Sequence, residues 1–100
     1  MSSGYCISLE AKRDLEDIWS YTKMKWSEQQ ADRYYQLIVR EINFISSKPL
    51  WGISYEHVRP GYRAAKMKSH LIFYKVVQDQ VHVVRILHER MNLEDHLAMD

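Results

Sequence analysis

Two consecutive segments with helical periodicity fill most of the first half of the chain, and they constrain the fold more than any other feature. In the first segment, apolar and aromatic residues recur at steps of three and four: Leu15, Ile18, Trp19, Thr22 and Trp26. That spacing predicts an amphipathic helix from about Ala11 to Lys25. The acids Glu10 and Asp14 near its start, and the bases Lys23 and Lys25 near its end, suit the helix dipole.

A second helix is predicted directly after the first. Ser27, followed by Gln30, forms a capping-box pattern at its start, and Pro49 ends it because proline has no N–H to donate. Its apolar stripe consists of Ala31, Tyr34, Tyr35, Ile38, Ile42 and Ile45. We expect the two helices to pack as an antiparallel hairpin, with the aromatic residues Trp19, Trp26, Tyr34 and Tyr35 in its core.

Strand-type sequence surrounds the helices. A short strand is expected at Tyr5–Leu9, and a meander of three strands is expected at about Tyr62–Lys68, His70–Val77 and Val81–Glu89, with Asp79-Gln80 as the last tight turn. The segment Ile53–Val58 receives no assignment. Asn92–Leu97 is expected to form one helical turn capped by Asn92.

Length and composition bound the class of protein. One hundred residues, 46% of them hydrophobic, suffice for one core, so we expect a single domain spanning residues 1–100. Cys6 is the one cysteine and cannot form an internal disulfide, and the N-terminus carries no secretion signal, so the cytoplasm is the expected location. No apolar run is long enough for a bilayer, and membrane insertion is not expected.

Positive charge is concentrated locally, although the net charge is only +1. Between His57 and Lys75 there is no Asp or Glu, whereas the same stretch carries the cations Arg59, Arg63, Lys66, Lys68 and Lys75. Crowding positive charge among strands is costly unless a partner or water compensates it. An acidic partner is one interpretation, and a solvated surface is the other.

Several motifs, in this order and spacing, resemble the ParE toxins of the ParE/RelE superfamily over nearly the whole chain. They are Asp14-Leu15 with Ile18 and Tyr21, Trp26 with Gln30-Ala31 and Tyr34, Pro49 with Gly52, Arg59-Pro-Gly-Tyr-Arg63, Ser69-His-Leu-Ile-Phe-Tyr74, and Val84-Arg-Ile-Leu-His88 with Arg90-Met91 and His96-Leu97. Ser27 departs from the family pattern, in which Gly commonly follows the Trp, but Ser is a good N-cap.

The resemblance implies an α+β fold in which an N-terminal strand and a two-helix antiparallel hairpin pack on a twisted, mainly antiparallel sheet, in the order β-α-α-β-β-β. It also implies the toxin of a type II toxin–antitoxin system, which inhibits DNA gyrase by stabilising the cleaved-DNA complex and is neutralised by a cognate ParD-like antitoxin. RelE relatives instead cut messenger RNA on the ribosome, and a fold alone does not separate the two activities.

Chemistry favours inhibition by binding. Cleaving a phosphodiester needs a base, an acid and a cation around one phosphate. The candidates for such a set are His70, His88, Tyr74, Arg63 and Arg85. On the last strand, however, Arg85 and His88 have opposite parity. We therefore predict no catalytic residue, no metal site, no cofactor and no sequence-specific binding of nucleic acid; a ribosome-dependent RNase and a structural domain of a larger complex remain the alternatives.

Binding residues are predicted in two groups. The antitoxin-facing group, placed beside the turn and strands that the resemblance assigns to the antitoxin, is Arg63, Lys66, Lys68, Arg85 and Arg90. The group expected to face the target lies mainly in the C-terminal segment and comprises Arg59, His88, Arg90, Met91, His96 and Leu97.

Overall fold

The computed structural model describes residues 4–91 and 97. Its elements follow the order β1 (Tyr5–Ile7), α1 (Leu9–Lys25), α2 (Glu28–Ser47), β2 (Ile53–Ser54), β3 (Arg63–Met67), β4 (His70–Val77) and β5 (Gln80–His88). The predicted α+β fold is confirmed. The structure also has a short strand, β2, in the segment Ile53–Val58, for which the sequence predicted no element. No helix in the described part of the chain has both the length and the apolar character needed to cross a bilayer.

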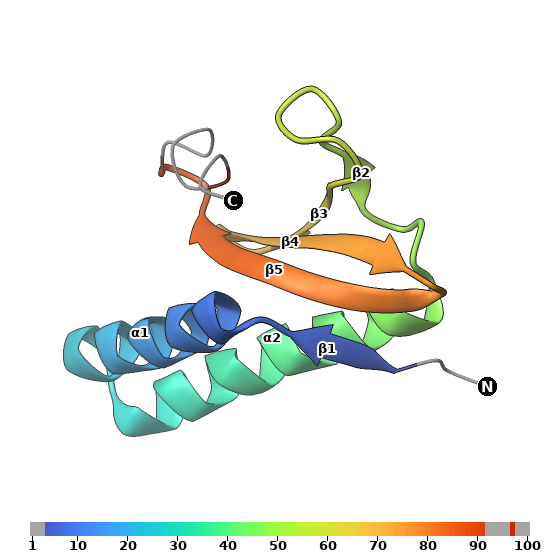
Figure 1. Ribbon diagram of the computed structural model, residues 1–100. Coiled ribbons are helices and arrows are strands. Elements are labelled where there is room, and N and C mark those ends of the chain that lie inside the picture. Colours follow the sequence, from blue (N-terminus) through green and yellow to red (C-terminus); the bar gives the residue numbers. More distant parts are fainter. Residues whose placement is uncertain (1–3, 92–96, 98–100) are drawn as a thin grey trace.

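The five strands form one sheet in the order β1-β5-β4-β3-β2. β1 runs parallel to β5, and the other neighbouring pairs are antiparallel. Figure 1 shows both helices on one face of the sheet, with the β2–β3 connection on the other. The predicted hairpin therefore covers one face of a mainly antiparallel sheet, and the far face is left to loops.

Serine side chains start both helices. The Ser27 hydroxyl accepts a hydrogen bond from the Gln30 N–H at 3.1 Å, so the predicted cap of α2 is confirmed. α1 begins at Leu9, earlier than predicted, because Ser8 caps it by accepting from Ala11 N–H at 3.0 Å. The hydroxyl of Ser8 also donates to the Val84 carbonyl at 2.7 Å, which fixes the start of α1 to β5.

Each face of the sheet carries an apolar cluster. Between helices and sheet, the cluster includes Leu15, Ile38, Ile42, Ile45, Ile72, Val81, Val83 and Ile86. On the far face, a smaller cluster comprises Tyr62, Ala64, Leu71, Phe73, Leu87 and Leu97. The consecutive buried residues Leu71 to Tyr74 on β4 are thus explained by burial on both faces, one under helices and one under loops.

Asp14 closes an otherwise open edge of β5. β1 pairs with β5 only from Val81 to Val83, so the next backbone groups of β5 need other partners. The Asp14 carboxylate accepts from the Ile86 N–H at 2.9 Å, and from Arg85 Nε at 2.8 Å and a terminal nitrogen at 3.0 Å. The carboxylate of Asp14 on α1 thereby provides an acceptor both for a backbone N–H at the edge of β5 and for the side chain of Arg85.

Two local predictions are wrong. The turn between β4 and β5 is centred on Gln78 and Asp79, whose φ angles of 51° and 66° are positive, and it starts one residue before the predicted pair. Both positive angles match the turn geometry that suits the twist of a hairpin. Trp26 and Tyr35, predicted in the hairpin core, are 70% and 38% exposed, because they lie outside the stripe that faces the sheet.

Candidate functional site

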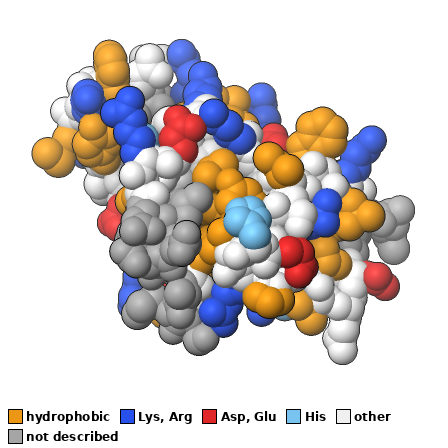
Figure 2. Space-filling model, turned by 90° about the horizontal axis from the view of Figure 1, so that it is seen from above, with side chains coloured by type: hydrophobic (Ala, Val, Ile, Leu, Met, Phe, Trp, Pro, Cys, Tyr) orange, Lys and Arg blue, Asp and Glu red, His pale blue; other side chains and the backbone are white. Residues whose placement is uncertain are grey.

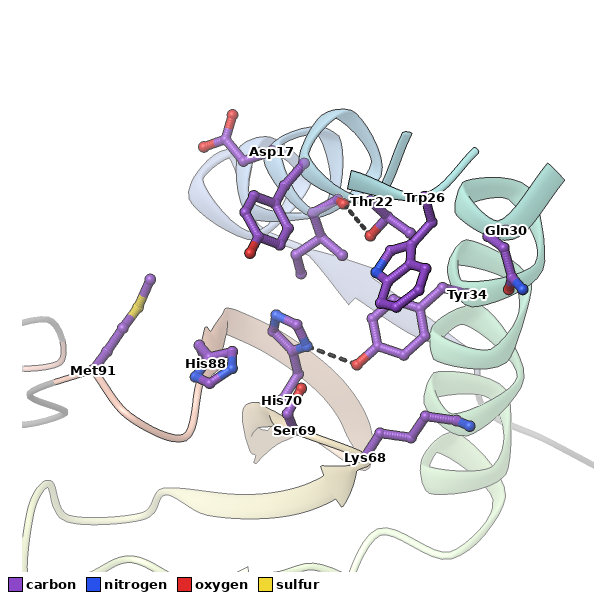
Figure 3. Close-up of a pocket in the computed structure, with 12 residues that line it drawn as sticks. Asp17, Thr22, Trp26, Gln30, Tyr34, Lys68, Ser69, His70, His88 and Met91 are labelled. Atoms are coloured by element: carbon purple, nitrogen blue, oxygen red, sulfur yellow. Dashed lines mark hydrogen bonds between the residues drawn. The ribbon is translucent and has the colours of Figure 1, made fainter. Parts of the chain in front are cut away.

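A pocket of about 690 Å³ opens where the hairpin end of α1 and α2 meets the ends of the strands. α1 contributes Ile18 and Tyr21, Trp26 lies between the helices, and α2 contributes Tyr34. Figure 3 shows Trp26 and Tyr34 on the helix side of the opening, with His70 and His88 opposite them. The wall is mainly apolar and aromatic, with a few polar groups on its floor, which is the usual make-up of a binding pocket.

Tyr34 fixes the orientation of His70 on the floor of the pocket. Its hydroxyl lies 2.7 Å from Nδ1 of His70 and donates to the Met67 carbonyl at 3.3 Å. The shorter of these contacts ties the imidazole to α2 in either tautomer of His70. Burial raises the pKa of Tyr34, partly offset by hydrogen bonds with Ser69, so the phenol stays protonated at neutral pH.

The second imidazole, His88, lies directly opposite His70 in the strand register, with 5.2 Å between ring centroids. Its Nδ1 accepts a hydrogen bond from the Arg90 backbone N–H at 3.1 Å. Burial lowers the pKa of His70, His88 lowers it further, and Asp14 and Glu89 act in the opposite direction. The floor of the pocket is therefore a pair of imidazoles in which His70 resists protonation in the free protein.

Acid should destabilise the fold through His70. Because its pKa is lower in the folded than in the unfolded chain, the unfolded chain binds the proton more tightly, and stability falls as the pH drops below about 6.5. His70→Asn, whose amide can still bond to Tyr34, should flatten that dependence. Urea unfolding of both proteins at pH 5, 6 and 7 measures it; parallel curves for the two would contradict this expectation.

The predicted antitoxin-facing cations do not form one surface. Arg85 is bound by Asp14. Arg63 donates to the carbonyls of Gly52 at 3.0 Å and Leu50 at 3.2 Å, and Lys66 pairs with Glu89 at 3.0 Å on the surface. Within the basic stretch, Lys66 thus gains an acid from the chain just after β5, and Arg63 gains backbone acceptors. Lys68 lines the pocket, and exposed Arg90 follows β5, next to the pocket residue His88.

The residues predicted to face the target are also divided. His88 and Met91 line the pocket. Arg59 lies half-buried in the β2–β3 connection, and Leu97 is only 2% exposed within the far-face cluster. Figure 2 shows hydrophobic, basic and acidic side chains interspersed when the molecule is seen from above. His96 lies outside the described residues.

Exposed aromatic residues in the pocket wall were missed by the sequence reasoning. Tyr21 and Trp26 are 61% and 70% exposed. Trp26 was predicted in the core because it continues the three- and four-residue spacing of the first helix. The available signal was position: Trp26 immediately precedes the Ser27 cap, so it belongs to the interhelical turn and not to a helix face.

The residues of the hypothetical RNase set lie apart. His70 and His88 share the pocket, but Tyr74 is four residues along β4. The Tyr74 hydroxyl donates to the Pro49 carbonyl and accepts from the Gly52 N–H, both at 2.8 Å. Together with the bonds of Arg63 and Arg85, these contacts give the other three members structural partners. Within residues 4–91 and 97, no three His, Cys, Asp or Glu side chains are grouped as metal ligands.

Comparisons with known proteins agree with this fold. Residues 5–93 match the family of the ParE toxin of the type II toxin–antitoxin system parDE. The chain is 39% identical to Toxin ParE1 of Caulobacter vibrioides, covering 94% of this chain and 97% of the relative. It is 37% identical to Toxin ParE1 of Mycobacterium tuberculosis, covering 97% and 100%.

Among solved structures, a chain of the chromosomal ParDE system from P. aeruginosa has a similar fold. Its TM-score is 0.76 at 19% identity, and the match covers 88% of this chain and 96% of that one. The family match and the curated relatives both span nearly all of the sequence and lead to the same assignment. This chain belongs to the ParE toxin family of type II toxin–antitoxin systems.

Proposed function

We propose that this ParE-family toxin inhibits DNA gyrase by binding it and stabilising its complex with cleaved DNA, without making or breaking a bond itself. The observation that carries the proposal is the family match over residues 5–93, together with relatives named as ParE toxins that align over almost their full length. Gyrase acts in the cytoplasm, so that compartment is the proposed location.

The positions of the polar side chains support inhibition by binding. A ribonuclease of this size needs an acid, a base and a cation converging on one phosphate. In this protein the other candidates already have structural partners: Arg63 and Tyr74 bond to backbone groups, and Arg85 bonds to Asp14. The two histidines lie apart from them, in the pocket beside the helices. That arrangement favours a protein-binding surface over a nuclease centre.

A ParD-like antitoxin is the second proposed partner. The structural relative from P. aeruginosa comes from a ParDE system, and the pocket offers exposed aromatic side chains near the basic residues Lys68 and Arg90. Surfaces of this composition suit an acidic segment that becomes ordered on binding. In this proposal, Lys68 and Arg90 contact the antitoxin, whereas Arg63 and Arg85 act mainly in the fold.

Pulse labelling after induction in bacteria tests the gyrase proposal. Inhibition of gyrase should reduce thymidine incorporation before methionine incorporation, because replication stops while translation continues on existing messages. Co-expression of the ParD-like antitoxin proposed above should restore both. Loss of methionine incorporation first would refute the gyrase assignment and favour cleavage of messenger RNA.

A further inference from the structure

We infer that an exposed apolar patch at the end of α2 and the start of β2 is a contact surface for the target of the toxin. The patch consists of Phe44, Leu50, Trp51 and Ile53. The inference rests on the proposed inhibition of DNA gyrase, and it adds a contact to the one that the sequence assigns to the C-terminal segment. The partner is a folded surface of gyrase with an apolar hollow for Trp51 and Leu50 and an acidic rim.

The backbone of the patch is held in place from inside the fold. The hydroxyl of the buried Tyr74 donates to the Pro49 carbonyl and accepts from the Gly52 N–H, both at 2.8 Å. The guanidinium of Arg63 donates to the carbonyls of Leu50 at 3.2 Å and Gly52 at 3.0 Å. A loop ordered in this way before binding loses little further conformational entropy when a partner arrives.

The side chains of this ordered segment point into solvent. Leu50, Trp51 and Ile53 are 74%, 61% and 68% exposed, and Phe44 is 38% exposed. The Trp51 ring meets Phe44 edge-on, with 5.2 Å between the ring centroids, which fixes its direction. All four lie outside the two apolar clusters that cover the faces of the sheet, so folding gains little from their size. Large apolar side chains gathered at the surface around a tryptophan mark a protein interaction site.

An open strand edge adjoins the patch. β2 is the last strand in the order of the sheet, and Ile53 pairs with Ala64 of β3 on its inner side. Within residues 4–91 and 97, no strand pairs with the outer side of β2. A partner that packs on the patch therefore meets both apolar side chains and the edge of a strand.

Charge around the patch is of one sign. From Asn43 to Tyr55 the sequence contains no Asp or Glu, and Lys48 is its one cation. The Lys48 side chain is exposed and forms no ion pair with the part of the chain that the structure describes. Arg63, bonded to the carbonyls of this segment, adds a second positive charge. The complementary surface is apolar at its centre and acidic at its rim.

The area of the patch favours a different protein over a second copy of this chain. At these exposures the four side chains present about 500 Å² of surface. Obligate dimers bury about 1,000 Å² or more on each partner, whereas reversible complexes bury about 800 Å², with an apolar centre and a polar rim. The patch is too small for a permanent dimer and suits the centre of a reversible complex.

The patch is separate from the pocket proposed for the antitoxin. The pocket lies at the hairpin end of α2, and the patch begins near the other end of this helix of 20 residues, about 30 Å long. Figure 1 shows the chain leaving α2 at the end far from the α1–α2 connection before it reaches β2. The residues predicted to face the target form no single surface, since Leu97 is buried and Arg59 half-buried. The patch supplies one.

DNA cleavage by purified gyrase, with supercoiled plasmid and ATP, tests the patch. The toxin concentration that gives half-maximal linear DNA should rise about ten- to a hundredfold for Trp51→Ala, and about three- to tenfold for Leu50→Ala. Leu9→Ala is the matched control, because Leu9 is 61% exposed, like Trp51, but lies at the start of α1. It should change that concentration less than about twofold.

Reversal of the charge at Lys48 tests the acidic rim. Lys48→Glu should raise the same concentration about three- to tenfold at low salt, and the difference should shrink as salt is added, because a charge at the rim acts through long-range attraction. An effect of Lys48→Glu that is absent at low salt would contradict an acidic partner surface.

Urea unfolding shows that each variant is folded, and Leu50→Ala keeps the test valid if Trp51→Ala is not. Unchanged cleavage with folded Trp51→Ala and Leu50→Ala would overturn this contact surface and leave gyrase inhibition intact. A dimer of the unmodified toxin in sedimentation that Trp51→Ala abolishes, with cleavage unchanged, would overturn it in favour of a second copy. Loss of neutralisation by the ParD-like antitoxin, again with cleavage unchanged, would overturn it in favour of the antitoxin. No cleavage with the unmodified toxin would overturn both proposals.

Discussion

Replacing Asp14 with alanine is expected to lower the free energy of unfolding by about 3 kcal/mol, because it removes the carboxylate that a half-buried guanidinium and a strand N–H share. The carboxylate receives three hydrogen bonds, from Arg85 Nε, an Arg85 terminal nitrogen and the Ile86 N–H, at 2.8 to 3.0 Å. The side chains of Asp14 and Arg85 are only 12% and 22% exposed, so water replaces little of the loss.

Urea unfolding followed by circular dichroism measures this effect. Glu16→Ala is the matched control, since Glu16 is an exposed acid on the same helix, and it should alter stability by no more than about 0.5 kcal/mol. In the double variant Asp14→Ala with Arg85→Ala, the cost should be at least about 1 kcal/mol below the sum of the single costs. If the loss of stability in the double variant equals the sum of the two single losses, the pairing of Asp14 with Arg85 does not itself stabilise the fold.

A Gly52→Ala variant is expected to lose about 2 to 4 kcal/mol of stability, through overpacking and a lost hydrogen bond. A Cβ atom at this position would lie 2.5 Å from the Tyr74 hydroxyl oxygen and 2.9 Å from the Ala64 carbonyl oxygen. Neither atom can move freely: Tyr74 is fully buried and its hydroxyl is bonded to both Pro49 and Gly52.

Gly61→Ala separates steric overlap from backbone strain. At Gly61, φ is 83° and an added Cβ would meet nothing within 4 Å, so only the backbone conformation is penalised, by about 1 kcal/mol. Thermal and urea unfolding of the two variants should therefore differ clearly. Equal losses, or a Gly52→Ala protein as stable as the unmodified one, would contradict the close packing described around Tyr74.

Helices were predictable from the sequence because their signals are local. The Ser27 cap and the three- and four-residue apolar steps need no knowledge of distant partners, and they located α2 to within a residue of its start. The short strand β2 carried no such signal, since its two residues are defined by pairing with Arg63 and Ala64 of β3. The turn at Gln78-Asp79 lacks glycine, which explains the error in its position.

The candidate site was less predictable because it depends on contacts across the chain. The positive charge between His57 and Lys75 looked unbalanced in sequence, yet Glu89 pairs with Lys66, and carbonyls of residues 50 and 52 bind Arg63. His70 and His88 were considered only as two of five candidates for a nuclease set, and it is the β4–β5 register that brings their rings together. Pairing of this kind cannot be read from composition or spacing.

The central claim is tested most directly by DNA cleavage with purified gyrase, supercoiled plasmid and ATP, titrated with the isolated toxin. Arg90→Ala, which removes an exposed cation after β5, is compared with Arg40→Ala, an exposed arginine on α2. We predict accumulation of linear, gyrase-bound DNA with the unmodified toxin and with Arg40→Ala, and little with Arg90→Ala. No accumulation at a large molar excess of folded toxin would contradict gyrase inhibition.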